Sequence, residues 1–408
     1  MDKKRIILSL LFILLVIAIG YLIYVVFFQK KPTTYLPQTT TPTTTGQFPQ
    51  TGNADKKPST TDQQGNGSEL FPTTEDTGTK ISQTEQVFTN KTQILDVPLS
   101  NLSSNEAGGT NFYNQIDGKF YRINKDGKVE ALTDKVFYNV QTVAWSPKND
   151  EAIIEYPDGA NIYYNFETKK QVTLPKHWQD FSFSSQDEKI TAKSIGLSPE
   201  NRWLITSDVD GNNIKLVEPM GENADKVIVD WSPNNQIIAM SLTGESLGMD
   251  RQEVLFVGQH GENFPSTIVE GRGLETKWSS DGNNLLYSVY NARNDYKPEL
   301  WLVKSDTESI GKGRRLLNLN TWADKCIFAD EKTIYCAVPE KLEKGAGFAP
   351  SLADTTADVL YKIDVNTGLK SQIPLDQDYY INSMSIDKNN NKLYFTDKNK
   401  NGLFEIPI

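Results

Sequence analysis

The sequence predicts an all-β fold, a seven-bladed β-propeller, and two observations lead to this prediction. A strand-like apolar run follows each copy of a short recurring phrase, and no amphipathic helix pattern appears in the chain beyond residue 86. The phrase recurs at steps of 38, 48, 47, 50 and 58 residues, a period typical of radial β arrays. Its three clear copies begin Trp145-Ser146-Pro147, Trp231-Ser232-Pro233 and Trp278-Ser279-Ser280, and its looser copies begin at Phe183, Phe328 and Ile386.

Each repeat divides into four short strands, and the fifth repeat shows the division most clearly. Its strands are expected at Glu275–Trp278, Leu285–Tyr290, Glu299–Lys304 and Arg314–Leu317. The last repeat has room for three strands only, and a sheet without its outer strand leaves an exposed edge. We therefore expect Thr92–Val97 to supply the fourth strand and close the ring. Six blades are the alternative if residues 98–132 pack irregularly.

The residue types of the phrase explain its structural role. A large aromatic ring ends a strand and buries apolar area between neighbouring blades, and the Ser-Pro or Ser-Asp-Gly that follows makes a tight turn. The stretch from Trp278 to Ser288, followed by Glu299-Leu300-Trp301-Leu302-Val303, resembles the repeats of TolB-like and WD-repeat-like propellers. Similar repeats form the N-terminal propeller of dipeptidyl-peptidase IV-like proteins. The resemblance implies the propeller fold over residues 140–400 and binding surfaces rather than one fixed chemistry.

The chain begins with a segment that predicts a membrane anchor. Residues 6–28 contain no charge, and 23 helical residues would extend about 34 Å, enough to cross a hydrocarbon core of about 30 Å. Three basic residues precede this run and two follow it, which places residues 1–5 in the cytoplasm and the rest of the chain outside. The alternative is a cleaved signal peptide, for which this apolar run is long and Ala18-Ile19-Gly20 is a poor cleavage site.

Residues 29–85 are expected to form a disordered linker. The segment is rich in Thr, Pro, Gln, Gly and Ser, as in residues 39–45, and large apolar residues are rare. Such a composition cannot bury enough surface to offset the entropy lost on ordering. We interpret the segment as a tether that carries residues 86–408, the propeller, away from the membrane and through a cell wall; a plain linker is the alternative.

The charge of the chain restricts its partners. The net charge is −10, and because residues 1–31 carry +4 the remainder carries −14. A body this acidic repels the phosphates of nucleic acids, and beyond residue 31 Lys and Arg never run longer than a pair. We therefore expect a protein or a cell-wall polymer as the partner, no nucleic acid, and membrane contact through residues 6–28 alone.

Two cysteines, Cys326 and Cys336, flank a predicted hairpin turn centred on Glu331. Residues directly opposed on adjacent strands have Cβ atoms about 4.5–5.5 Å apart, close to the separation that a disulfide needs. An extracytoplasmic location would favour oxidation. The alternative is a pair of buried thiols that pack as small hydrophobic groups.

The sequence offers no catalytic, cofactor or metal site. The string Gly244 to Gly248 matches the G-x-S-x-G pattern of hydrolases around Ser246, but no helix pattern follows, and only 14 residues separate this serine from His260. The string from Asp397 to Gly402 copies half of a calcium loop, yet Ile408 stands where the bidentate acid is required. With two histidines in the chain, we propose no clustered metal site, no cofactor and no enzymatic activity.

The loops carry the remaining information about function. The connections between second and third strands are long in three successive repeats, at residues 242–252, 291–298 and 339–358, and all of them belong to one face of a propeller. Long loops on one face suggest a recognition surface, and Arg, Tyr and Trp are favoured anchors of interfaces. The candidate contacts are Asp250, Arg251, Arg272, Arg293, Tyr296, Trp322 and Phe348.

These observations predict a membrane-tethered, extracytoplasmic propeller that binds a protein or a polymer and is not an enzyme. The alternative is a hydrolase or lyase with its site at the mouth of the central channel, which would need carboxylates or histidines that converge there. A structural spacer without a ligand is a third alternative.

Overall fold

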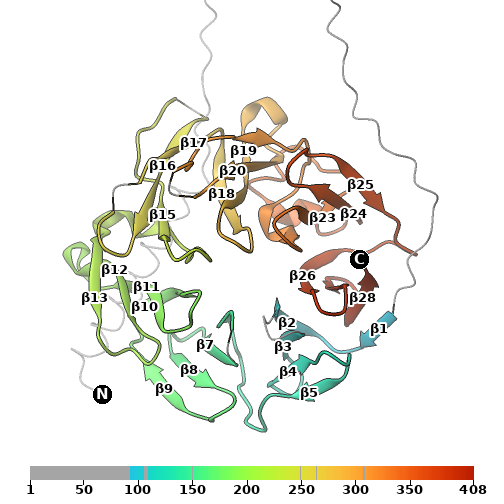
Figure 1. The fold of residues 1–408 in the computed structure, drawn as a ribbon, viewed down its shortest axis with the longest axis horizontal. Coiled ribbons are helices and arrows are strands. Elements are labelled where there is room, and N and C mark those ends of the chain that lie inside the picture. The colour runs from blue at the N-terminus through green and yellow to red at the C-terminus, as the bar shows by residue number, and fades with distance from the viewer. Residues whose placement is uncertain (1–91, 105–108, 149, 249, 263, 307) are drawn as a thin grey trace, which may run out of the picture. The chain divides into compact units, whose positions relative to one another are not determined.

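The computed structural model describes residues 92–104, 109–148, 150–248, 250–262, 264–306 and 308–408, which form seven four-stranded antiparallel sheets arranged as a ring (Figure 1). The predicted all-β propeller of seven blades is therefore confirmed. From the channel outward, the first blade consists of β2 (Leu99–Ser104), β3 (Thr110–Asn114), β4 (Lys119–Ile123) and β5 (Val129–Ala131), and the second of β6 (Thr142–Trp145), β7 (Glu151–Glu155), β8 (Asn161–Asn165) and β9 (Gln171–Leu174). The third blade consists of β10 (Trp178–Phe183), β11 (Lys189–Ile195), β12 (Arg202–Asp208) and β13 (Lys215–Pro219), and the fourth of β14 (Val227–Val229), β15 (Ile237–Ser241), β16 (Gln252–Gly258) and β17 (Thr267–Val269). The fifth blade consists of β18 (Arg272–Trp278), β19 (Asn284–Tyr290), β20 (Pro298–Lys304) and β21 (Arg315–Leu316), and the sixth of β22 (Cys326–Phe328), β23 (Thr333–Pro339), β24 (Asp358–Asp364) and β25 (Lys370–Ile373).

The seventh blade contains both ends of the described chain. Strands β26 (Ile381–Asp387), β27 (Lys392–Asp397) and β28 (Leu403–Pro407) form its inner part, and β1 (Thr92–Leu95) pairs antiparallel with β28 as its outer strand. The pairing of Gln93 with Phe404 fixes the register. Closure of the ring by an N-terminal strand is thus confirmed, and β1 covers the edge of β28 that would otherwise be unpaired.

The first blade excludes the six-bladed alternative and contains one strand that was not expected. Residues 98–132 do not pack irregularly, because Leu99–Ser104 forms an inner strand that the sequence analysis did not identify. The strand is polar, and its pairing with β3 is interrupted between Ser100 and Ser103. Asn101 lies there with a φ of 54°, and an irregular strand with few apolar residues gives no alternating pattern to detect.

The recurring phrase performs two structural tasks, which its copies in the fourth and fifth blades illustrate. Trp278 is 9% exposed and packs with Ile237 and Met240 of the preceding blade. Ser279 follows it, and its hydroxyl accepts a hydrogen bond from the amide of Asn284 at 2.9 Å, which closes the turn between the first two strands. Ser232 accepts an equivalent bond from the amide of Ile237, also at 2.9 Å. The phrase therefore both fills the space between blades and fixes each turn.

Short 3-10 helices occupy several connections between strands. They are η1 (Pro199–Asn201), η2 (Gly221–Lys226), η3 (Ala292–Asn294), η4 (Ala323–Lys325) and η5 (Pro350–Ala353). Within the described ranges, no helix combines the length and the apolar character needed to cross a membrane. The predicted anchor at 6–28 and the predicted linker at 29–85 lie outside the described residues.

Candidate functional site

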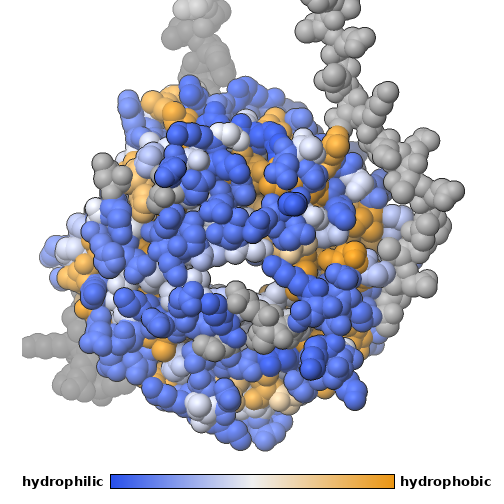
Figure 2. Space-filling model, in the orientation of Figure 1, coloured by the Kyte–Doolittle hydropathy of each residue, from blue (hydrophilic) through white to orange (hydrophobic). Residues whose placement is uncertain are grey.

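The two faces of the propeller carry different connections. Because every blade is antiparallel, the connections from second to third strand and from blade to blade lie on one face, which we call the loop face. The turns from first to second and from third to fourth strand lie on the opposite turn face. Figure 2 shows the central opening of the ring with mainly hydrophilic residues around it.

Two of the long connections on the loop face are joined to each other. The amide of Gly345 donates to the carbonyl of Asp295 at 2.8 Å, and the amide of Gly347 donates to the carbonyl of Tyr296 at 2.7 Å. Asp295 and Tyr296 both have positive φ, 52° and 55°, which is unusual for a bulky residue and is held here by these bonds. The β19–β20 and β23–β24 connections therefore form one surface.

This surface presents an exposed aromatic side chain. Phe348 is 60% exposed, and its ring makes edge contacts with Tyr290 and Tyr296, with ring centroids 6.0 and 5.8 Å apart. Leu352, on η5, is 39% exposed. Large apolar side chains that are fixed by neighbours and still face water mark surfaces that another molecule can cover.

A cluster of arginines from three different connections converges on Glu270. Glu270 carries an oxygen 2.8 Å from Arg293 and another 2.9 Å from Arg314, and Arg251 approaches to 3.9 Å. The hydrogen bond from Arg293 is the main reason that the pKa of Glu270 falls below its ordinary value. The side chains of Arg251 and Arg293 remain 49% and 67% exposed, so most of their donor groups face water.

The backbone links the arginine cluster to the aromatic group. Asn291 donates to the carbonyl of Glu270 at 3.0 Å, accepts from the amide of Arg293 at 3.0 Å, and accepts through its carbonyl from the amide of Tyr296 at 2.9 Å. Asn291 is 1% exposed, which makes it the fixed point of the loop. We call the exposed surface around Phe348, Arg293 and Arg251 the aromatic–arginine surface.

The predicted contact residues have different outcomes. Arg251, Arg293, Tyr296 and Phe348 come together, and Asp250 acts electrostatically on Arg293. Arg272 is exposed at the start of β18, where its Cα partner is Tyr290.

Trp322 does not belong to this surface. It is 5% exposed and packs under the long connection against Leu342 and Ala346, so the expectation that its side chain is presented on the loop face is corrected. The sequence analysis also missed Glu270, Arg314 and Tyr290, since nothing in their local pattern distinguishes them from ordinary strand residues.

Cys326 and Cys336 occupy directly opposed positions on β22 and β23 and form a disulfide. Their Cα atoms are 4.1 Å apart, and both residues are buried. The bond ties the innermost strand of the sixth blade to its neighbour, directly after η4 at the channel mouth.

A second group of polar residues lies at the mouth of the channel on the loop face. Glu275 on β18 and Asp324 on η4 line a cavity of about 90 Å³ together with Trp322, Asp358 and Lys398. Burial and, secondarily, the charge of Asp324 raise the pKa of Glu275 to about 7. Among the described residues, neither Glu275 nor Asp324 forms an ion pair within 4 Å.

A larger hollow of about 810 Å³ lies at the loop face between the second, third and fourth blades. Glu155 and Asp180 line it, and burial and the nearby charge of Asp180 raise the pKa of Glu155 to about 7. Lys193, 8% exposed, forms a 2.7 Å ion pair with Asp180, which sits at an interruption of the β10–β11 pairing with a φ of 56°.

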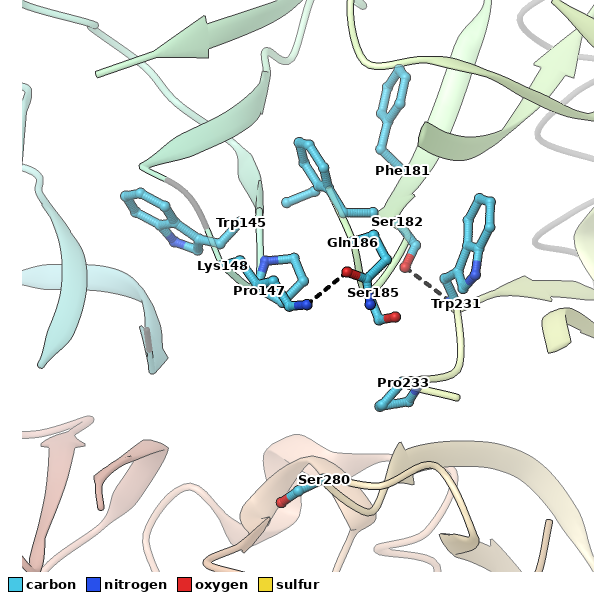
Figure 3. A pocket seen from close by; sticks show the side chains of 12 residues that line it. Trp145, Pro147, Lys148, Phe181, Ser182, Ser185, Gln186, Trp231, Pro233 and Ser280 are labelled. Atoms are coloured by element: carbon cyan, nitrogen blue, oxygen red, sulfur yellow. Dashed lines mark hydrogen bonds between the residues drawn. The ribbon is translucent and has the colours of Figure 1, made fainter. Parts of the chain in front are cut away.

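A third hollow, of about 490 Å³, lies on the turn face (Figure 3). Its wall is built from the recurring phrase of adjacent blades, with Trp145 and Trp231 at its two sides and Lys148 bonded to Gln186 at 2.9 Å between them. Ser182 accepts a hydrogen bond from the amide of Trp231 at 2.9 Å. These contacts hold blades together, in agreement with the structural interpretation of the phrase.

No group of three or more His, Cys, Asp or Glu side chains within the described ranges could hold a metal ion. Ser246 lies on an exposed connection, where its hydroxyl donates to the carbonyl of Gly248 at 3.5 Å, and it pairs as an isolated bridge with Gln252. Asp397 accepts from the amides of Asn399 and Lys400 at 2.8 Å, as expected of a β-turn.

Comparison with known proteins finds similarity in structure alone. No protein-family model and no curated protein matches the chain by sequence. Oligogalacturonate lyase from Vibrio parahaemolyticus superposes with a TM-score of 0.54 at 12% identity, over 80% of this chain and 95% of that one. The β-propeller domain of Cps50 (Swd1) from Myceliophteria thermophila gives 0.51 at 9% identity, over 78% and 100%.

TolB from Acinetobacter baumannii also matches, over 69% of this chain and 64% of that one, with 10% identity and a TM-score of 0.42. The tricorn protease matches over 78% of this chain and 34% of its own length, with 10% identity and a TM-score of 0.49. At these identities the similarity shows the fold alone, and the matches with a TM-score above 0.5 agree with the expected β-propeller.

Proposed function

We propose that this chain is a membrane-tethered, extracytoplasmic binding module without enzymatic activity, and that its propeller captures a protein partner through the aromatic–arginine surface. Residues 6–28 act as the anchor and residues 29–85 as the tether in this proposal. A buried disulfide between Cys326 and Cys336 supports an oxidising location, because such bonds persist outside the cytosol.

The observation that carries the proposal is the position of Phe348. Its ring is 60% exposed but rests on Tyr290 and Tyr296, so it is presented in one place rather than left free. An aromatic side chain with two χ angles loses little entropy on binding, and arginines at its side can pair with carboxylates or carbonyls of a partner. Aromatic residues and arginine carry most of the binding energy in known interfaces.

The experiment is a pull-down with the full chain and three variants. Phe348→Ala and Arg293→Ala each remove an exposed group of the surface, while Leu369→Ala removes an equally exposed apolar residue, 61% accessible, from a turn-face connection. We expect both loop-face variants to weaken capture of the same partner by tenfold or more, since a hot-spot residue contributes about 2 kcal/mol or more, and the turn-face variant to leave it unchanged.

Equal capture by all four proteins would refute the role of this surface. Recovery of a wall polymer rather than a protein, still lost in Phe348→Ala, would retain the surface and change the partner.

A second candidate function, a hydrolase or lyase, is favoured by one observation. Glu155 and Asp180 lie together in the 810 Å³ hollow, with the pKa of Glu155 near 7 and Lys193 paired to Asp180. A carboxyl group with a raised pKa beside a second carboxyl group is an arrangement that acid–base chemistry uses. Release of fragments from a cell-wall polysaccharide that stops in Glu155→Gln and continues in Phe348→Ala would establish this function instead.

A further inference from the structure

One ion pair of the ring holds an amine directly against a carboxyl group and keeps both largely out of water. Nζ of Lys325, on η4, lies 2.6 and 2.7 Å from the two carboxylate oxygens of Asp358, at the start of β24. The side chain of Asp358 is completely buried, and that of Lys325 is 13% exposed. The nitrogen therefore lies next to the carbon that carries both oxygens.

The carboxyl group of Asp358 is prepared to accept a nucleophile. Its Oδ2 accepts a hydrogen bond from the amide of Ile381 at 2.8 Å. A backbone N–H that already points at this oxygen stabilises the negative charge that the oxygen acquires when a nucleophile attacks the carbon. Burial raises the pKa of Asp358 above its ordinary value, while the charge of Lys325 opposes this shift. Burial thus favours the protonated carboxyl group, the form that an amine attacks.

Asp324 supplies a second carboxyl group that can carry protons. It precedes Lys325 in the chain, acts electrostatically on that lysine, and lines the same cavity as Lys325 and Asp358. Burial raises the pKa of Asp324, and the charge of Lys325 acts in the opposite direction. A carboxyl group with a raised pKa can accept a proton and return it near neutral pH. The cavity of about 90 Å³ exceeds the roughly 10–15 Å³ that one water molecule needs, so it has room for a water molecule that a reaction releases.

We propose that Lys325 and Asp358 condense to an intramolecular isopeptide bond that joins η4 to β24. Nζ passes a proton to Asp324 and attacks Cγ of Asp358, so that an N–C bond forms. A C–O bond then breaks, and the oxygen leaves as water with the proton that Asp324 returns and a second proton from Nζ. One ammonium and one carboxylate thus give one amide and one water molecule, without an oxidant, a reductant or another reactant. The bond does not depend on the binding function proposed above.

Proximity and burial together favour the amide over its hydrolysis. Well-oriented reacting groups within one molecule reach effective molarities of about 10⁵–10⁸ M, far above the concentration of liquid water. The product also replaces two buried charges by a neutral group, which removes the cost of keeping them out of water. Lys392 and Glu405 form a pair of similar geometry, with Nζ 2.9 Å from both oxygens, but their side chains are 33% and 17% exposed. We therefore expect no amide between Lys392 and Glu405, and this pair is the internal control.

Tryptic digestion of the full chain, reduced with dithiothreitol and read by tandem mass spectrometry, tests the proposal. Trypsin does not cleave after a lysine whose side chain is acylated, so we expect residues 316–332 joined to residues 345–362, with a mass one water molecule below their sum. Cleavage after Lys392 should be normal. Recovery of residues 316–325 and 345–362 as separate peptides from the natural chain would overturn the proposal.

Variants assign the bond to these side chains. An ion pair alone would also stabilise the blades, so the readout in each variant is the joined peptide and not stability. Lys325→Arg keeps the charge but has no amine to condense, and Asp358→Ala has no carboxyl group; neither should give the joined peptide, and its appearance in either would refute the assignment. Asp324→Asn, shown by circular dichroism to be folded, should lower the joined fraction in freshly purified protein at least tenfold. An unchanged fraction there would overturn the role of Asp324 in the proton transfer.

Discussion

Lys325 on η4 and Asp358 at the start of β24 form a buried ion pair in which Nζ lies 2.6 and 2.7 Å from the two carboxylate oxygens. The Asp358 side chain is completely buried, and it also accepts a hydrogen bond from the amide of Ile381 at 2.8 Å. Because Ile381 begins the inner strand of the seventh blade, one carboxylate holds the entry to the sixth blade, its third strand and the next blade together.

Removal of the lysine should destabilise the ring strongly. In Lys325→Met the Asp358 carboxylate would stay buried without a counter-charge, and loss of one partner of a buried pair costs about 3–5 kcal/mol. Urea unfolding followed by tryptophan fluorescence measures the change. The double variant Lys325→Met with Asp358→Leu should recover much of the loss, and a single variant as stable as the natural chain would contradict the role of the pair.

Deletion of β1 should open the last blade. Ile94 and Leu95 pack against the cluster that contains Leu403, and the carbonyl of Leu95 lies close to Gly402. A chain that lacks residues 92–96 exposes the edge of β28, so its amides should lose protection from hydrogen exchange and the protein should tend to aggregate. Unchanged protection of β28 would show that the ring does not need this strand.

The disulfide should contribute to stability by restricting the unfolded chain. Cys326 and Cys336 are separated by 10 residues, and closure of a loop of that size is worth about 2–3 kcal/mol in the chain-entropy model. Thermal unfolding of the double variant Cys326→Ala with Cys336→Ala measures the contribution of the disulfide to stability. The comparison is the natural protein with and without dithiothreitol. Dithiothreitol should lower the melting temperature of the natural protein and leave that of the variant unchanged.

Stability should rise as the pH falls from 8 to about 5. The pKa values of Glu155, Asp230 and Glu275 are raised to about 7 in the folded protein, chiefly by burial. Between their ordinary values and pH 7 the folded state binds more protons than the unfolded state, so the free energy of unfolding decreases as pH increases through this window. Urea midpoints at pH 5.5 and 8 measure the slope. Glu275→Gln should flatten it, and a midpoint that rises with pH would contradict the assignment.

A methyl group added at Gly347 should separate the β19–β20 connection from the β23–β24 connection. An ideal Cβ on Gly347 would lie 2.4 Å from Cβ of Tyr290 and 2.7 Å from the carbonyl oxygen of Tyr296. Gly347→Ala therefore should break the hydrogen bond between the connections and increase proteolysis of residues 339–358 while the blades stay folded. Gly127→Ala, at a turn where a Cβ would meet no atom within 4 Å, is the control for the steric clash, although its φ of 75° adds backbone strain that Gly347→Ala lacks.

The sequence predicted the ring because its information is local and repeated. Trp278 and Ser279 act within one turn and one blade contact, so their spacing alone indicates the architecture. The inner strand Leu99–Ser104 escaped prediction because it is polar and irregular.

The candidate surface was predictable only in part. Loop length pointed to Phe348 and Arg293, which the structure places on the exposed loop face, but Glu270, the carboxylate that contacts the arginines, is positioned by tertiary contacts that sequence spacing does not reveal. Trp322 was misplaced because the connection after β23 folds back over it, and a loop residue in sequence can be a core residue in space.

Site-specific photocrosslinking on intact cells tests the proposed binding surface most directly. A benzophenone amino acid replaces Phe348 in one version of the full chain and Leu369, exposed on the turn face, in another. We expect the label at 348 to crosslink one discrete protein, and the Arg293→Ala substitution in the same chain to abolish that crosslink, while the label at 369 gives none. Identical crosslinks from both positions, or none from position 348, would contradict the proposal that the aromatic–arginine surface is where this propeller binds its partner.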